Sequence, residues 1–241
     1  MALSSEQKDK YYHTTFLKEI KEEGQEKLLA SKVVVLGAGG LASSALTYLA
    51  SMGVGNITIV DDDKVSLSNL PRQILYTYKD IGEYKVEAAK RRLEALNPDV
   101  KVFIHKERLT SLNASKIIKE HDIVLDCTDN FETKFLIDDV CHELNIPFII
   151  AGVSDYQGQV CTCLPHQTKG FKSLFTILPI NIEQKYKDED QGVFPPCIGV
   201  ISDIAVSEVI KYLLGFKDLL TNKMLIANLK NNDFKIIKFP K

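Results

Sequence analysis

The chain has 241 residues, 45% hydrophobic and 26% charged, which suits a soluble globular protein with a sizeable core. A formal net charge of −2 and the lack of a long basic run argue against nucleic-acid binding. The polar first ten residues do not resemble a secretory signal, and no apolar run nears the roughly 20 residues that span a bilayer. Five scattered cysteines fit reduced thiols, so we expect a cytoplasmic protein without a membrane segment.

The amino-terminal stretch of residues 5–30 is predicted to be helical. Its apolar residues, including Ile20 and Leu28, recur at a spacing that places them on one side of a helix. Gly24 is expected to break the stretch into two pieces.

The stretch that follows is expected to organise the whole fold. A β-branched run, Val33-Val34-Val35-Leu36, enters a glycine turn, Gly37-Ala38-Gly39-Gly40, and a helical pattern continues to about Met52. A second apolar run, Ile57-Thr58-Ile59-Val60, ends in three carboxylates, Asp61-Asp62-Asp63. Strand, glycine turn, helix, strand and terminal acid form the βαβ unit of nucleotide- and dinucleotide-binding proteins.

The physical basis of this interpretation is the approach of a phosphate to the turn. Small residues let the backbone come close, and the helix amino terminus offers free N–H groups. An acid roughly 20 residues on, here Asp61, suits a ribose hydroxyl. The match is weak in isolation because Ala42 replaces the third glycine, so NAD or FAD binding and a turn without ligand both stay open.

Alternating strand and helix patterns continue the parallel series as far as residue 151. Parallel strands place their ligand at their carboxyl ends, where Gly37, Asp61 and Asp129 all lie. The predicted elements are a loop with a short helix at 65–80, a helix at 82–97, a strand at 100–104, a short helix that ends at 116–121, a strand at 123–125, a helix to about 145 and a strand at 148–151.

Beyond Gly152 the pattern changes, because strands follow one another without an intervening helix and are therefore expected to be antiparallel. A charged loop at about 181–192 is long enough for a lid or a crossover. The chain is thus predicted to be an α/β protein with a Rossmann-like, mostly parallel sheet extended by antiparallel strands. The elements of this part are strands at 159–164 and 173–178, a helix at 200–214, and closing strands at 224–229 and 234–239.

Four motifs occur in one order: Gly37-Ala-Gly-Gly-Leu41, Asp61-Asp-Asp63, Ser68-Asn69-Leu-Pro-Arg72-Gln73 and Asp126-Cys-Thr-Asp-Asn130, with Lys85 between the last two. Together they resemble the ubiquitin-activating-enzyme-like adenylyltransferases (HesA/MoeB/ThiF type), and the branch that they resemble most is the bacterial molybdopterin- and thiamine-biosynthesis enzymes. The resemblance runs from about Tyr11 to Gly215.

The resemblance implies ATP-dependent adenylation of the C-terminal glycine carboxylate of a small ubiquitin-like sulfur-carrier protein that ends in Gly-Gly. Arg72 and Lys85 would neutralise the approaching anions, which makes positioning and charge the main sources of catalysis. Asp129 would hold Mg²⁺ through its oxygens and completes the catalytic set with the two cations. The nucleotide-binding residues implied are Gly37, Gly39, Gly40, Asp61, Ser68, Asn69, Arg72, Lys85, Asp129 and Asn130.

Each assignment has a simpler structural alternative. Asp61 could be a turn acid at a strand end, and Arg72 could form a surface ion pair. Lys85 could be solvated on its helix, and Asp129-Asn130 could only cap the helix that follows.

The chain departs from the family at the amino terminus, where an arginine that reaches the partner subunit's nucleotide is usual. Tyr11-Tyr12-His13-Thr14 stands there, and His13 would carry a charge only when protonated. Lys134 stands where the family often has another arginine. It keeps the positive charge but lacks the planar, bidentate donor geometry of a guanidinium.

A second departure concerns metal and thiol chemistry. The zinc-binding cysteine pairs are missing, since Ser173 and Thr176 align with the first pair, so no structural zinc site is expected. Cys161 and Cys163, with His166, could form a displaced metal site or a buried strand face. Cys197, in an apolar setting, could be a nucleophile or an inert buried thiol.

We expect one domain over residues 1–241, with amino-terminal helices to about residue 30, a nucleotide-binding half at 31–152 and a carrier-binding antiparallel part at 153–241. The first hypothesis is an adenylyltransferase that acts on a ubiquitin-like sulfur-carrier protein as a homodimer, with ATP and Mg²⁺ as cofactors. A catalytically weakened, partner-binding scaffold is the second. An NAD-dependent oxidoreductase, or adenylation of a small molecule or a tRNA base, remains open. The identity of the carrier, and hence the pathway, does not follow from the sequence.

Overall fold

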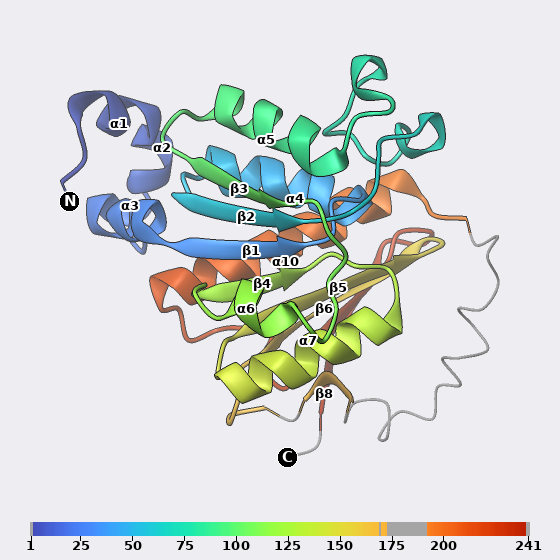
Figure 1. The fold of residues 1–241 in the computed structure, drawn as a ribbon. Helices are drawn as coiled ribbons and strands as arrows, with labels where there is room; N and C mark the ends of the chain where they lie inside the picture. Colours follow the sequence, from blue (N-terminus) through green and yellow to red (C-terminus); the bar gives the residue numbers. More distant parts are fainter. Residues whose placement is uncertain (1, 169, 173–191, 240–241) are drawn as a thin grey trace.

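The computed structural model describes residues 2–168, 170–172 and 192–239. In this part of the chain eight strands form one sheet, in the order β3-β2-β1-β4-β5-β6-β7-β8 (Figure 1). The strands β1 to β5 run parallel, and β6 to β8 are antiparallel. The predicted fold class is therefore confirmed. The strands are β1 (Lys32–Leu36), β2 (Asn56–Val60), β3 (Lys101–His105), β4 (Ile123–Asp126), β5 (Phe148–Ser154), β6 (Gln157–Cys163), β7 (Lys223–Asn228) and β8 (Asp233–Lys238).

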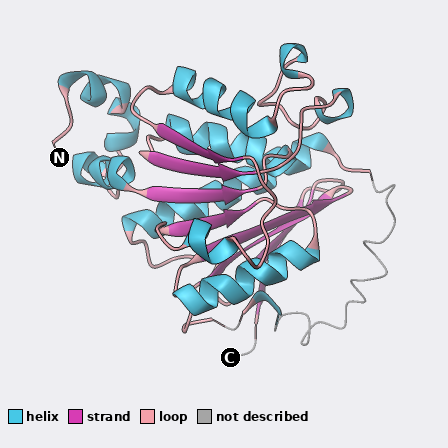
Figure 2. Cartoon of the chain, in the orientation of Figure 1, coloured by secondary structure: helices cyan, strands magenta, loops and turns pink. Residues whose placement is uncertain are grey.

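Helices cover both faces of the sheet (Figure 2). One apolar cluster joins the sheet to α3, α4, α5 and α10, and a second joins it to α6 and α7. Successive residues of β1 enter different clusters, Val33 and Val35 the first, Val34 and Leu36 the second, as expected for a strand buried on both faces. The helices are α1 (Ser5–Lys10), α2 (Tyr12–Thr15), α3 (Lys21–Ala30), α4 (Gly40–Ser51), α5 (Lys85–Leu96), α6 (Ala114–Ile118), α7 (Phe131–Leu144) and α10 (Pro195–Leu214).

The prediction that Gly24 breaks the amino-terminal helix is wrong. Gly24 lies inside α3, and the break falls at residues 16–20. A Cβ at Gly24 would lie 3.1 Å from Ile20 Cγ2 and 3.2 Å from Leu214 Cδ2. The glycine therefore allows close packing of α3 against the end of α10, and this tertiary contact outweighs its low helix propensity.

The amino-terminal helices are anchored at the edge of the sheet where β2 and β3 begin. The buried Tyr11 hydroxyl donates to Asp99 Oδ2 at 3.0 Å and accepts from Asn97 Nδ2 at 2.8 Å. Burial raises the pKa of Tyr11 to about 12. The segment that carries His13 is thereby fixed at the amino-terminal edge of the parallel strands.

The antiparallel part is joined to the parallel part by α10, which packs against β5, β6 and α4. This helix begins at Pro195, five residues before its predicted start, because two prolines occupy its first turn, where no N–H is needed. The predicted strand 159–164 and the closing hairpin are confirmed within two residues. The predicted strand 173–178, and all of the loop 181–192 except its last residue, lie outside the described residues. No described helix is both long enough and apolar enough to span a membrane.

Candidate functional site

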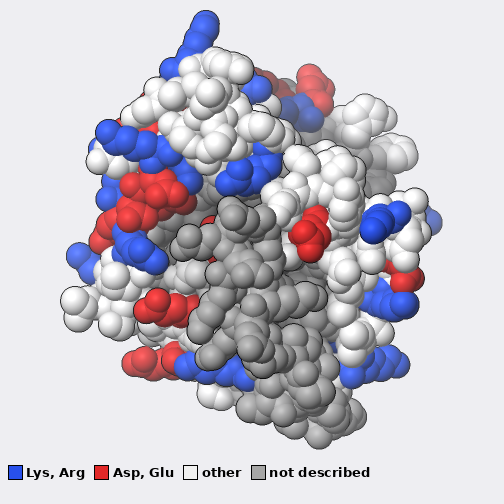
Figure 3. Space-filling model, turned by 90° about the vertical axis from the view of Figure 1, so that its right-hand side faces the viewer, with Lys and Arg blue, Asp and Glu red and all other residues white. Residues whose placement is uncertain are grey.

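A cavity of about 720 Å³ opens at the carboxyl ends of the parallel strands. It lies where the strand order reverses, between β1 and β4, which is the usual ligand position in open α/β sheets. Figure 3 shows the side of the molecule that includes this edge, with both basic and acidic side chains exposed on it. Arg72 and Lys85 line the cavity together with Asp61 and Asp63, which suits a ligand that carries both anionic groups and hydrogen-bond donors.

The glycine turn after β1 forms the floor of the cavity. Gly37 has a φ of 91°, and a Cβ there would lie 2.9 Å from the Cys127 carbonyl oxygen, so only glycine fits. A Cβ at Gly40 would lie 3.2 Å from the Arg72 carbonyl oxygen. The turn is thus closed against the loops that follow β2 and β4, and the amino terminus of α4 faces the cavity.

Asp61, at the end of β2, stabilises this turn. Its Oδ2 accepts the Ala38 N–H at 2.7 Å, and its Oδ1 accepts the Asp63 N–H at 2.8 Å. Burial raises the pKa of Asp61, while Lys85 and the two N–H groups oppose that rise. Each oxygen keeps a lone pair on the cavity side, so the turn role and a ribose-binding role are compatible.

Lys85, the first residue of α5, is buried rather than solvated, which excludes the simpler alternative for this residue. Its Nζ donates to Asp63 Oδ2 at 2.7 Å, and its side chain is 6% exposed. Both residues line the cavity. An ammonium in this position can exchange Asp63 for a phosphate oxygen while it stays charged and buried.

The loop after β4 is held by a fully buried carboxylate, Asp126. Its Oδ1 accepts the Thr128 N–H at 2.9 Å and the Thr128 hydroxyl at 2.6 Å. Its Oδ2 pairs with Lys134 Nζ at 2.9 Å, and the same ammonium donates to the Ala151 carbonyl at 2.9 Å. Lys134, which takes the place of a family arginine, is therefore committed to Asp126 and β5 in this structure.

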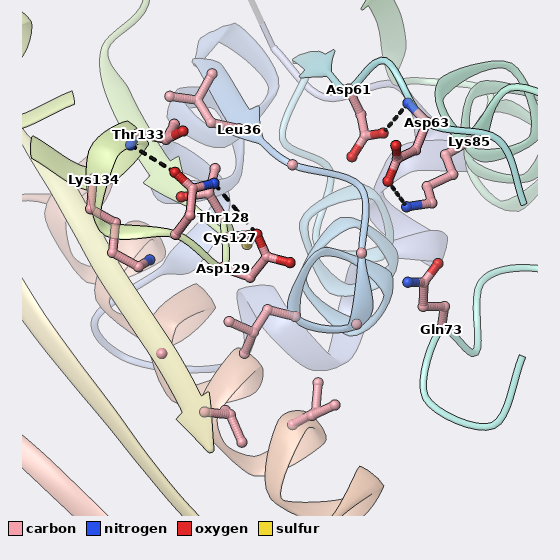
Figure 4. Close-up of a pocket in the computed structure, with 18 of the residues that line it drawn as sticks. Leu36, Asp61, Asp63, Gln73, Lys85, Cys127, Thr128, Asp129, Thr133 and Lys134 are labelled. Carbon is pink, nitrogen blue, oxygen red and sulfur yellow. Dashed lines mark hydrogen bonds and ion pairs between the residues drawn. The ribbon is translucent and has the colours of Figure 1, made fainter. Parts of the chain in front are cut away.

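Asp129 and Asn130 follow in this loop and differ in what they do. Asn130 Oδ1 accepts the Thr133 N–H at 2.9 Å, so the predicted cap of α7 is confirmed. Asp129 is exposed, and its carboxylate points into the cavity (Figure 4). Among the described residues its only hydrogen-bond neighbour is Asn130 Nδ2, at 3.5 Å. Free carboxylate oxygens of this kind fit a hard divalent cation such as Mg²⁺.

The Ser68–Arg72 motif forms a tight turn beside the glycine loop. Asn69 Oδ1 accepts the Ser66 N–H at 3.1 Å, and Arg72 Nη1 donates to the Ser68 carbonyl at 2.9 Å. Asn69 and Arg72 line the cavity, whereas Ser68 does not and its hydroxyl contacts Ser66 Oγ. The structure thus brings every predicted site residue to the cavity except Ser68.

Some lining residues were missed by sequence reasoning. Gln73 is the last residue of the motif that begins at Ser68, but the motif alone does not assign it a ligand-binding role. The loop 107–109 follows β3, and residues 152–154 are the last three of β5, so the same strand-end rule would have identified them.

Metal and thiol predictions have a mixed outcome. Ser173 and Thr176 lie outside the described residues, so the absence of zinc stays a prediction. Cys161 and Cys163 are buried in the second apolar cluster, as the strand-face interpretation requires. Cys197 is fully buried and burial raises its pKa, which favours the inert thiol. In the described chain the only metal-sized group of acidic, thiol or imidazole ligands is Asp61, Asp62 and Asp63, within 4.8 Å of one another.

The topology and the cavity define an α/β protein of the doubly wound class, with its ligand site at the switch point. The chain belongs to the ThiF family, whose pattern matches residues 11–241. It is 39% identical, over 98% of its length, to a probable molybdopterin-synthase adenylyltransferase of Porphyra purpurea, of which it spans 62%.

Two further comparisons cover more of the related protein. The chain is 35% identical to the sulfur carrier protein adenylyltransferase of Thermus thermophilus, over 98% of this chain and 88% of that one. The crystal structure of Escherichia coli MccB superposes with a TM-score of 0.87 and 23% identity, over 99% of this chain and 71% of that one, and establishes likeness of fold alone.

Proposed function

We propose that this chain transfers AMP from ATP to the C-terminal carboxylate of a small ubiquitin-like sulfur-carrier protein that ends in Gly-Gly, with release of pyrophosphate. One observation carries the proposal: the ordered motifs converge on one cavity in a chain whose adenylyltransferase relatives match nearly its whole length. The volume of about 720 Å³ suits a nucleotide with a peptide terminus beside it.

The nucleotide would lie across the glycine turn. Asp61 would accept from a ribose hydroxyl, and the amino terminus of α4 would face the phosphates. Arg72 and Lys85 would offset the repulsion between the incoming carboxylate and the α-phosphate, since both line the cavity beside the turn. Because the carboxylate is already a nucleophile, catalysis rests on charge and alignment rather than on a general base.

Asp129 is the residue proposed to hold Mg²⁺, because its oxygens are the least committed in the cavity. When bound, the cation would neutralise charge on the departing pyrophosphate. Asp126 cannot share this task, since it is fully buried, pairs with Lys134 and does not line the cavity.

A homodimer is part of the proposal. His13 does not line the cavity of its own chain, and α2 is fixed at the opposite edge of the sheet through Tyr11. Two exposed aromatic residues lie nearby, Tyr12 on α2 and Phe16 directly after it. In a dimer His13 would reach the partner's nucleotide.

The second candidate function is a partner-binding scaffold with weak turnover. It is favoured by a specific departure, since His13 stands where the family usually has an arginine, whose charge is permanent. Loss of such a cation removes charge stabilisation of the transition state.

Pyrophosphate–ATP exchange that depends on a Gly-Gly-ended carrier tests the proposal. We expect exchange with the cognate carrier, and none when its terminal glycine is removed. ATP binding without exchange, unchanged by Asp129→Ala, would support the scaffold. If the missing cation causes the weak exchange, His13→Arg should increase the exchange rate. Sedimentation velocity would separately test whether the chain forms a dimer.

A further inference from the structure

Gln73 is a buried polar side chain that points into the cavity. It is 3% exposed and lies on the same side as Lys85 and Asp61, across from Asp129 (Figure 4). A Cβ built on Gly39 would lie 3.8 Å from Gln73 Nε2, so the carboxamide covers the turn where the glycine leaves space. Its main chain is fixed by hydrogen bonds to Asn69 and Tyr76.

The carboxamide has unfilled hydrogen-bonding capacity. Within the described residues Gln73 Oε1 is buried and has no hydrogen-bond partner. Burial of a polar group without a partner destabilises a protein, so such a group in a cavity indicates a ligand that completes it. Nε2 is the carboxamide atom beside the glycine turn, and turning the amide over would exchange its place with that of the unpartnered Oε1.

Gln25 shows how the same residue type behaves when its role is structural. It is fully buried far from the cavity, and its Nε2 donates to the Met52 carbonyl at 2.9 Å, although its Oε1 also has no partner in the described chain. Gln25 thus joins α3 to the end of α4. Gln73 makes no comparable side-chain bond to the described protein.

We propose that Gln73 is a nucleotide-binding residue whose carboxamide spans the glycine turn. Its N–H donates to a nonbridging phosphate oxygen, and its oxygen accepts from a donor that arrives with the nucleotide, either a ribose hydroxyl or a water on the divalent cation. This inference rests on the proposed use of ATP and adds a residue that is neutral at every pH. Its neutrality lets it bind a phosphate without adding to the charge of Arg72 and Lys85.

The test uses Gln73→Met, which keeps the volume and removes both hydrogen-bonding groups, with Gln25→Met as the matched control. Calorimetry measures ATP binding to the full chain, and thermal unfolding measures the free protein. For Gln73→Met we expect ATP affinity to fall about tenfold or more, and the Tm of the free protein to stay or rise, because an unsatisfied polar group is lost. For Gln25→Met we expect the reverse, a lower Tm and unchanged ATP affinity.

Unchanged ATP affinity in Gln73→Met, or a fall in its Tm as large as that of Gln25→Met, would overturn the inference. A wild-type protein that binds no ATP would instead overturn the proposed function. The donor is identified by repeating the comparison with 2′,3′-dideoxy-ATP and without Mg²⁺. The condition in which the affinity difference between wild type and Gln73→Met becomes smaller identifies the donor, because the phosphate contact remains in both. An affinity difference of unchanged size in both conditions overturns the acceptor part of the inference.

Discussion

The carboxyl ends of β2 and β4 carry aspartates that share one hydrogen bond and differ in their other partners. Asp61 directly follows β2 and Asp126 is the last residue of β4, and each carboxylate accepts the N–H of the residue two positions on. Asp61 accepts one further N–H and faces the cavity. Asp126 accepts a hydroxyl and an ammonium as well and is fully buried.

The difference shows that a buried cation decides which carboxylate is left for a ligand. Lys134 pairs with Asp126 inside the protein, and the loop that this aspartate holds presents Asp129 to the cavity. At β2 the corresponding cation, Lys85, pairs with the exposed Asp63 instead, so Asp61 keeps its outward lone pairs. One turn geometry thus yields a structural acid in one place and a ligand-facing acid in the other.

The largest effect should come from breaking the buried pair. Lys134→Met leaves the Asp126 carboxylate without its cation at a site with no exposure, and we expect a loss of about 3–5 kcal/mol in the free energy of unfolding. Asp126→Asn combined with Lys134→Met removes both charges and should recover at least half of that loss. Urea unfolding of the single and double variants measures both.

The exposed pair of Lys90 and Glu94 on α5 supplies the control. Lys90→Met should cost about 0.5 kcal/mol or less. If Lys134→Met costs no more than this, Asp126 is not held by its cation and the contrast between the two strand ends fails.

Asp129→Asn should affect catalysis rather than folding. Because Asp129 is exposed and the α7 cap comes from Asn130, the free energy of unfolding should stay within about 0.5 kcal/mol of wild type. Loss of a Mg²⁺ ligand should lower carrier-dependent pyrophosphate exchange about 10²–10³-fold. Exchange that equals wild type at every Mg²⁺ concentration would remove Asp129 from the metal site.

Much of the fold was predictable because the parallel strands contain short apolar runs, rich in valine and isoleucine, bounded by turn residues. Val33 to Leu36 is apolar throughout, which indicates a strand covered on both faces. Gly24 was misread because low helix propensity is visible in a sequence, whereas the approach of Leu214 across more than 180 residues is not. Likewise, α10 starts at Pro195 because proline is favoured in the first turn of a helix, whereas the sequence prediction begins this helix only after the two prolines.

The order of the motifs in the sequence was enough to predict which residues meet at the site. It was not enough to predict which of these side chains form hydrogen bonds within the protein and which stay available to a ligand. Asp61 and Asp126 look equivalent in the sequence, as acids that end parallel strands. Only the structure shows that one of them is buried and paired with Lys134, and that Gln73 Oε1 has no partner in the described chain. Ser68 was predicted from its motif, yet its hydroxyl turns to Ser66.

Asp61→Asn should weaken nucleotide binding. A hydrogen bond from a ribose hydroxyl to a carboxylate contributes about 1.5–3 kcal/mol, so ATP affinity should fall roughly 10–150-fold. The variant also alters the turn at Ala38, and 2′,3′-dideoxy-ATP separates the two causes. Wild type should lose affinity for this analogue while Asp61→Asn should not. An equal loss in both would place the ribose elsewhere.

The smallest effect, and the one specific to Asp61, is a dependence on pH. Burial raises the pKa of this carboxyl in the folded protein above its ordinary value near 3.9. The stability that Asp61 contributes is therefore complete below the unfolded pKa and is lost as pH rises through the folded pKa. Wild type should lose stability relative to Asp61→Asn over that window.

Protonation also removes the charged acceptor, so ATP affinity of wild type, but not of Asp61→Asn, should fall as pH drops from 7 toward the raised pKa. Calorimetric titrations of both proteins across this pH range would show the divergence in ATP affinity. Superimposable curves would mean that the charged carboxylate of Asp61 does not bind the nucleotide, and the contrast with Asp126 would fail.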